Sequence, residues 1–187
     1  MTRLRTDRFN ETIIVRSRGK LLARALVVLF LAALLAELAH VALARDITGN
    51  DAPDFALKST AGKNVRLSEY RSEVVAVTFW ASWCGGCRDN LATLEKLQQE
   101  VGVDGLRVLG VSFDKDMLAA SEAAAAAGAT FPILLDTVGD VGRQYHVGRL
   151  PLVVLVDRGG KIRASYEGGR SATAPTLDKE IRELLRE

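Results

Sequence analysis

Two cysteines, Cys84 and Cys87, are the residues of this chain best suited to chemistry. They are the only cysteines among 187 residues, so any intramolecular disulfide joins this pair, and a four-cysteine zinc site is excluded. A thiolate can attack a disulfide, and a second thiol three residues along can then close a new bond. We therefore predict reversible thiol–disulfide exchange, with Cys84 as nucleophile and Cys87 as resolving thiol. Gly85 and Gly86 between them leave room for a substrate backbone.

Two other interpretations of the pair are possible. An inert structural bridge would close so small a loop that its stabilisation is slight. A metal site needs more ligands, and His146 is the only histidine after residue 44, so Cys84, Cys87 and His146 are the one set available. We favour redox chemistry without a bound metal or cofactor, and keep a copper-binding chaperone as the contrasting hypothesis.

The cysteines lie between a predicted strand and a predicted helix. Residues 74–80 (VVAVTFW) are β-branched, small or aromatic with almost no polar break, which is typical of a strand buried on both faces. From Cys84 to about Glu100, leucines recur at helical spacing before Gly102 provides a stop. We therefore expect Cys84 at the N-terminus of the helix, where unpaired amides and the helix dipole stabilise a thiolate.

The rest of the chain after residue 51 alternates predicted strands and helices. A small hairpin is expected around residues 61–64, and the further predicted elements are strands at 106–113, 131–135, 152–157 and 162–166 and helices at 116–127, 138–145 and from about Pro175 onward. This order predicts one α/β domain over residues 52–187, with a mixed central sheet covered by helices on both faces.

The first 44 residues have a different character. They carry seven Lys or Arg against three acidic residues, and residues 25–36 (ALVVLFLAALLA) are uncharged and apolar. A basic stretch before an apolar run is typical of a secretory signal, and Ala42 and Ala44 supply a cleavage pattern. Residues 21–44 are also long enough to span a bilayer as a signal anchor, which we favour.

Either form of this segment predicts the same location for the domain. Because the cations precede the apolar run, they stay in the cytoplasm, and the linker at residues 45–51 leads to a domain in the periplasm or on the extracytoplasmic face of a bacterial inner membrane. The whole chain has a formal charge of +2, so the part after residue 44 is slightly acidic. It lacks the basic footprint that nucleic acid requires, and we exclude nucleic acid as a partner.

Four segments resemble the TlpA/ResA-type thiol-disulfide oxidoreductases of the thioredoxin superfamily. They are residues 52–55 (APDF), 65–68 (VRLS), 79–88 (FWASWCGGCR) and 145–151 (YHVGRLP), and the third is highly specific. The resemblance implies a thioredoxin-like fold and a membrane-tethered bacterial enzyme. It also implies protein disulfides or dithiols as substrates, with apocytochrome c cysteines as one candidate class, and a membrane thiol relay as the electron donor.

The resemblance assigns further residues to the site. Pro151 matches a proline that forms a cis peptide bond and faces the cysteines, which would leave the backbone of Leu150 free to pair with an extended substrate. We expect four residues to contact the substrate: Leu150, Trp83, Gly85 and Gly86.

The chain also departs from the family pattern. Gly86 replaces a common proline, so the reduction potential and the direction of electron flow are not predicted. Thr78 replaces a buried aspartate and Asn90 a glutamate, so the proton acceptor for Cys87 is not identified. The APDF segment also occurs in peroxiredoxins, which makes a thiol peroxidase a further alternative, although no T-x-x-C pattern precedes Cys84.

Overall fold

The computed structural model describes residues 24, 26–34, 47–168 and 174–187. The chain divides into two units, Met1–Asp46 and Ile47–Glu187. In the first unit, residues 24 and 26–34 are helical, and the remainder of the predicted signal or anchor segment lies outside the described residues. None of the helices in the described part of the chain combines the length and apolar character needed to span a bilayer.

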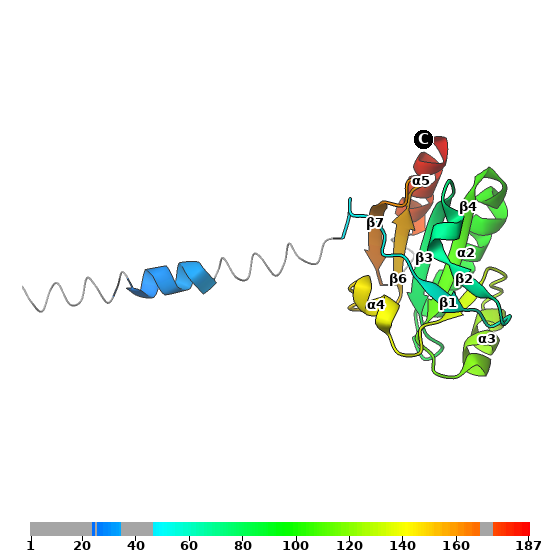
Figure 1. Cartoon of the computed structure of the whole chain (residues 1–187), viewed down its shortest axis with the longest axis horizontal. Coiled ribbons are helices and arrows are strands. Elements are labelled where there is room, and N and C mark those ends of the chain that lie inside the picture. Colours follow the sequence, from blue (N-terminus) through cyan, green and yellow to red (C-terminus); the bar gives the residue numbers. More distant parts are fainter. Residues whose placement is uncertain (1–23, 25, 35–46, 169–173) are drawn as a thin grey trace, which may run out of the picture. The chain divides into compact units, whose positions relative to one another are not determined.

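The second unit is built on a five-stranded mixed sheet with the strand order β5-β4-β3-β6-β7 (Figure 1). The strands are β3 (Val74–Trp80), β4 (Leu106–Ser112), β5 (Ile133–Leu135), β6 (Leu152–Val156) and β7 (Ile162–Glu167). β3 pairs in parallel with β4 and antiparallel with β6. All seven residues of β3 are buried, so the prediction of a central strand for residues 74–80 is confirmed.

Helices and a small hairpin cover this sheet. They are α2 (Cys87–Val101), α3 (Met117–Ala126), α4 (Asp140–Gln144) and α5 (Ala174–Arg186), with the hairpin β1 (Ala56–Lys58) and β2 (Asn64–Arg66) and the short 3-10 helices η1 (Leu67–Tyr70) and η2 (Gly102–Asp104). α3 begins where the Asp116 side chain accepts the N–H of Leu118, and Gly128 follows its end with a φ of 76°.

Alternation along the strands divides the apolar interior into two cores. On one face, Val74, Ala76 and Trp80 of β3 pack with α2, α3 and α5 in what we call the helical core. On the other face, the remaining apolar residues of β3 pack with α4 and the hairpin segment in the aromatic core, where Phe79 and Tyr145 have ring centroids 5.2 Å apart. Helices on both faces of a mixed sheet are therefore confirmed.

The predicted strand at 131–135 is too long by two residues. β5 begins at Ile133, because Pro132 has no N–H to contribute to a strand ladder. The carbonyl of Pro132 still accepts the N–H of Gly110 at 2.9 Å. The loop before β5 therefore reaches β4, although it is not part of the strand.

Candidate active site

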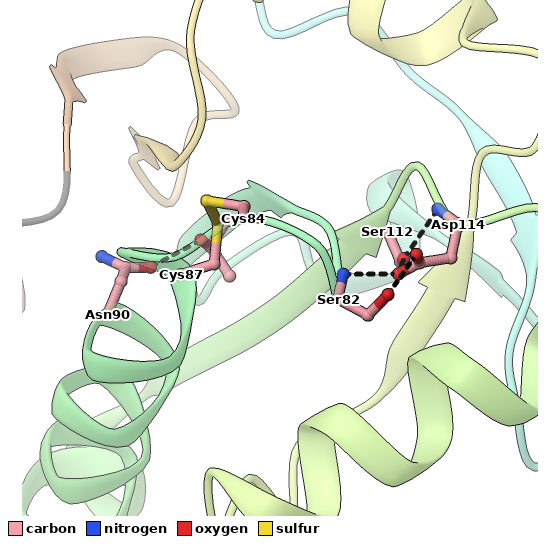
Figure 2. The surroundings of a disulfide bond; sticks show 7 residues. Ser82, Cys84, Cys87, Asn90, Ser112 and Asp114 are labelled. Carbon is pink, nitrogen blue, oxygen red and sulfur yellow. Dashed lines mark hydrogen bonds between the residues drawn. A yellow bond between two sulfur atoms is a disulfide. The ribbon is translucent and has the colours of Figure 1, made fainter.

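Cys84 and Cys87 form a disulfide in the loop that joins β3 to α2 (Figure 2). Their Cα atoms are 5.4 Å apart, within the usual range for a disulfide. The two residues differ in exposure: Cys87 is fully buried in the helical core, whereas Cys84 is partly exposed. A substrate can therefore reach only one sulfur of the pair directly.

The prediction that Cys84 opens the helix is wrong by three residues. α2 begins at Cys87, and Gly86 is its N-cap. Cys84 instead lies in a turn, where its N–H donates to the carbonyl of Ala81 and its own carbonyl accepts the N–H of Cys87, both at 3.1 Å. Two consecutive glycines are poor helix formers, so the helix starts only after them. The helix N-terminus is thus one turn away from Cys84.

A surface depression of about 540 Å³ lies beside Cys84. Its lining residues are Trp83, Cys84, Gly85, Gly86, Phe113, Val147, Gly148, Arg149 and Leu150. The structure therefore brings the four predicted substrate-contacting residues together with the predicted nucleophile. Trp83 is 72% exposed, which is unusual for so large an apolar side chain.

Pro151 follows the depression without lining it. The Leu150–Pro151 peptide bond is cis, as predicted, and Pro151 is buried immediately before β6. Its carbonyl accepts the N–H of Gly168 at 2.8 Å. Pro151 is thus the neighbour of a lining residue, since Leu150 contributes to the depression itself.

Sequence reasoning missed Phe113 as a site residue. The apolar pattern predicts a buried strand at residues 106–113, whereas β4 ends at Ser112 and Phe113 follows it. Its ring packs against Gly142 of α4 so closely that a Cβ atom there would lie 2.3 Å from Cζ of Phe113. Phe113 can occupy this position only because residue 142 of α4 is a glycine. No local pattern in the sequence predicts this contact. Val147, Gly148 and Arg149 belong to the segment 145–151, whose resemblance to the family was the available signal.

Asn90, three residues after Cys87 on α2, takes part in a hydrogen bond between two uncharged side chains. Thr78 of β3 is fully buried, and its hydroxyl donates to Oδ1 of Asn90 at 2.9 Å. These are the two positions at which the sequence departs from the pattern of the family it resembles. Neither side chain titrates in the range of a thiol, so this pair provides hydrogen bonding and no general base.

His146 is exposed and has a φ of 53°. Within the described residues, no group of three or more His, Cys, Asp or Glu is arranged to hold a metal ion. The ligand set Cys84, Cys87 and His146 is therefore not assembled in this structure, and the copper-chaperone hypothesis gains no geometric support from it.

The sequence profile of the AhpC/TSA family matches residues 48–165, more than half of the chain. The chain belongs to the AhpC/TSA family. It is 30% identical over 158 residues to the thiol-disulfide oxidoreductase ResA of Geobacillus thermodenitrificans, covering 82% of this chain and 91% of that relative. It is also 35% identical over 123 residues to the thioredoxin-like protein YneN of Bacillus subtilis, covering 64% and 71% of the two chains.

Solved structures agree with these relatives. A crystal structure from Chlorobium tepidum, of a thiol:disulfide interchange protein DsbE, superimposes with a TM-score of 0.71 at 35% identity, covering 74% of this chain and 97% of that one. The fold of this AhpC/TSA protein is thioredoxin-like, and its activity is that of a thiol-disulfide oxidoreductase.

Proposed function

We propose that the protein reduces or exchanges disulfides of protein substrates outside the cytoplasm, with Cys84 as nucleophile and Cys87 as resolving thiol. This assignment rests on one observation: Cys84 and Cys87 differ in their exposure to solvent. Cys84 lies in the depression, and Cys87 is 0% exposed. An incoming disulfide therefore meets Cys84 first, and Cys87 is confined to reaction with Cys84.

The reduction proceeds in two exchange steps. The Cys84 thiolate attacks one sulfur of the substrate disulfide, forming a mixed disulfide and releasing the other substrate sulfur as a thiolate. Cys87, once deprotonated, attacks the sulfur of Cys84 and releases the second substrate thiolate. The substrate gains two electrons and, after protonation of its thiolates, two protons, while the protein ends as the Cys84–Cys87 disulfide. An external dithiol must then reduce that disulfide, and the reverse sequence oxidises a substrate.

The depression suits an extended polypeptide around a substrate cysteine. Gly85 and Gly86 carry no side chains that would keep a backbone away from Cys84. Trp83 offers an exposed ring for apolar contact. Leu150 also lines the depression, and in this proposal its backbone pairs with the substrate. Pro151 acts in this proposal by presenting Leu150 rather than by touching the substrate.

The location and the electron donor rest on the N-terminal sequence and the family. The basic and apolar order of residues 1–44 supports export, with residues 45–51 as a linker to the domain at 52–187. We propose a membrane thiol relay as the reductant and cysteines of apocytochrome c as one substrate class. An alkaline phosphatase fusion after residue 51 tests export, since the reporter is active only outside the cytoplasm.

Insulin reduction and mixed-disulfide trapping test the roles of the cysteines. Cys84→Ser should abolish insulin reduction, because no accessible nucleophile remains. Cys87→Ser should accumulate mixed disulfides through Cys84, because nothing resolves them; these are counted on non-reducing gels after alkylation. Full activity of both variants would refute the assignment. Peroxide consumption by the wild type, measured in parallel, would instead favour the thiol peroxidase alternative.

A further inference from the structure

A buried carboxylate, Asp114, lies beneath the loop that carries Cys84. Asp114 is 5% exposed and follows β4 by two residues. Figure 2 shows its side chain directed toward Ser82, two residues before Cys84. Oδ2 of Asp114 accepts the N–H of Ser82 at 2.8 Å, and Oδ1 accepts the hydroxyl of Ser82 at 2.7 Å. A third bond, from the hydroxyl of Ser112 to Oδ2 at 2.7 Å, holds the carboxylate from the β4 side.

The carboxylate of Asp114 accepts a backbone N–H just beyond the end of the β3–β4 ladder. The last paired residues of the parallel ladder are Trp80 and Ser112, and the N–H of Phe113 still donates to the carbonyl of Trp80 at 3.0 Å. In a longer parallel ladder, the next N–H on this side to face β4 would be that of Ser82, and it would donate to a backbone carbonyl. The carboxylate of Asp114 replaces that carbonyl, so β4 positions the loop beyond the end of β3.

The hydrogen bonds between Asp114 and Ser82 affect Cys84 because Ser82 and Cys84 belong to the same turn. The N–H of Cys84 donates to the carbonyl of Ala81 at 3.1 Å, and Ser82 lies within that turn. Fixing both the backbone and the side chain of Ser82 therefore restricts the backbone on which the Cys84 sulfur is carried. Charge-assisted hydrogen bonds of this kind are short and stronger than neutral ones, which suits a fixed loop.

We propose that Asp114 is a positioning residue for Cys84: through Ser82 it holds the loop so that the sulfur is aligned with both Cys87 and an incoming disulfide. This inference rests on the proposed role of Cys84. Preorganisation of two thiols favours closure of their disulfide, and it also favours attack in line on a substrate. Both the equilibrium and the rate therefore depend on Asp114.

The test compares Asp114→Ala with Asp114→Asn in the full chain. Asparagine keeps an oxygen for the N–H of Ser82 and the hydroxyl of Ser112, and its amide can donate to Oγ of Ser82, so it retains the geometry and loses the charge. For Asp114→Ala we expect kcat/KM for insulin reduction to fall about tenfold or more. The Cys84–Cys87 equilibrium with glutathione should shift about tenfold toward the dithiol, which corresponds to about 30 mV. Asp114→Asn should stay within about threefold of the wild type in both measurements.

Glu95 provides a matched control. Its carboxylate is 6% exposed and accepts three hydrogen bonds, from the N–H and hydroxyl of Thr130 and from Nε2 of Gln99. It lies along α2, two turns beyond Cys87. Glu95→Ala should lower the melting temperature as Asp114→Ala does, yet leave the glutathione equilibrium unchanged. A merely structural role for Asp114 predicts the same unchanged equilibrium for Asp114→Ala.

Ser82→Ala keeps the test decisive if Asp114→Ala does not fold. Ser82 is exposed, and this variant loses only the hydroxyl bond, so a smaller shift of the glutathione equilibrium in the same direction is expected. A wild-type glutathione equilibrium in Ser82→Ala, or in Asp114→Ala when it folds, would overturn the inference. If the wild type itself does not reduce insulin, the proposed function is wrong. The glutathione equilibrium would still test the role of Asp114.

Discussion

The two faces of the sheet make different contributions to the site. The helical core contains Cys87 and packs against Cys84. The aromatic core packs against Phe113 and Val147, which also line the depression. Leu150 packs against both cores. Separate sets of packed residues, on opposite faces of one sheet, therefore support the two cysteines and the part of the depression formed by Phe113 and Val147.

A change in either core should therefore affect a different measured property. A cavity in the helical core away from the first turn of α2 should lower stability and spare substrate binding. A change in the aromatic core that moves Phe113 should alter binding of the substrate even where stability is largely kept. The following variants test that division.

Leu94→Ala should have the largest effect on stability. Leu94 lies on α2, is fully buried in the helical core, and its truncation leaves a cavity that costs about 2–5 kcal/mol. We expect the free energy of unfolding in urea to fall by this amount while KM for insulin stays at the wild-type value in folded protein. A severalfold rise in KM would show that the two cores are not independent.

Gly142→Ala should have a smaller effect on stability and a direct effect on the site. The added Cβ would lie 2.3 Å from Cζ of Phe113, so the ring must shift, at a cost of about 1–3 kcal/mol. Because Phe113 lines the depression, KM for insulin should rise, whereas the Cys84–Cys87 equilibrium with glutathione should not change. Leu94→Ala serves as the control, since it loses stability without moving Phe113.

Glu95→Gln should make the pH dependence of stability weaker. Burial alone would raise the pKa of Glu95, but the hydrogen bonds from Thr130 and Gln99 outweigh it and lower the pKa below its usual 4.5. The carboxylate therefore stabilises the fold above about pH 4.5, and this contribution is lost as the pH falls through the lowered pKa. The variant should lose about 1–2 kcal/mol at pH 7, and urea titrations should show the difference shrinking below pH 4.5. An equal difference at pH 7 and pH 3 would contradict this assignment.

Tyr145→Phe should have the smallest effect. Burial raises the pKa of Tyr145, so its hydroxyl stays protonated and donates to the carbonyl of Pro53 at 2.8 Å across the working pH range. Loss of that bond should cost about 1 kcal/mol in urea unfolding. KM should be unchanged, because the phenyl ring remains against Phe79. An altered KM would mean that the whole aromatic core, and not Phe113 alone, sets the depression.

Local patterns predicted much of this fold. The apolar run at 74–80 matches β3 residue for residue, because a strand with both faces buried needs no polar position. The helix at 116–127 was predicted to within one residue at each end, since Asp116 and Gly128 carry cap chemistry that is legible in the sequence. The start of α2 was predicted three residues too early, because two glycines after Cys84 favour a turn over a helix.

The pair of thiols and the strand and helix that flank them could be predicted from the sequence alone. These features depend on residues within a few positions of one another. The tertiary structure alone decided which distant groups serve that pair. Asp114 reaches Ser82 across 32 positions, Gly142 makes room for Phe113, and the side chain of Gln98 bonds the N–H of Val108 and the carbonyl of Leu106 at the edge of β4. Such contacts arise when strands align in a sheet, and spacing along the chain carries no record of that alignment.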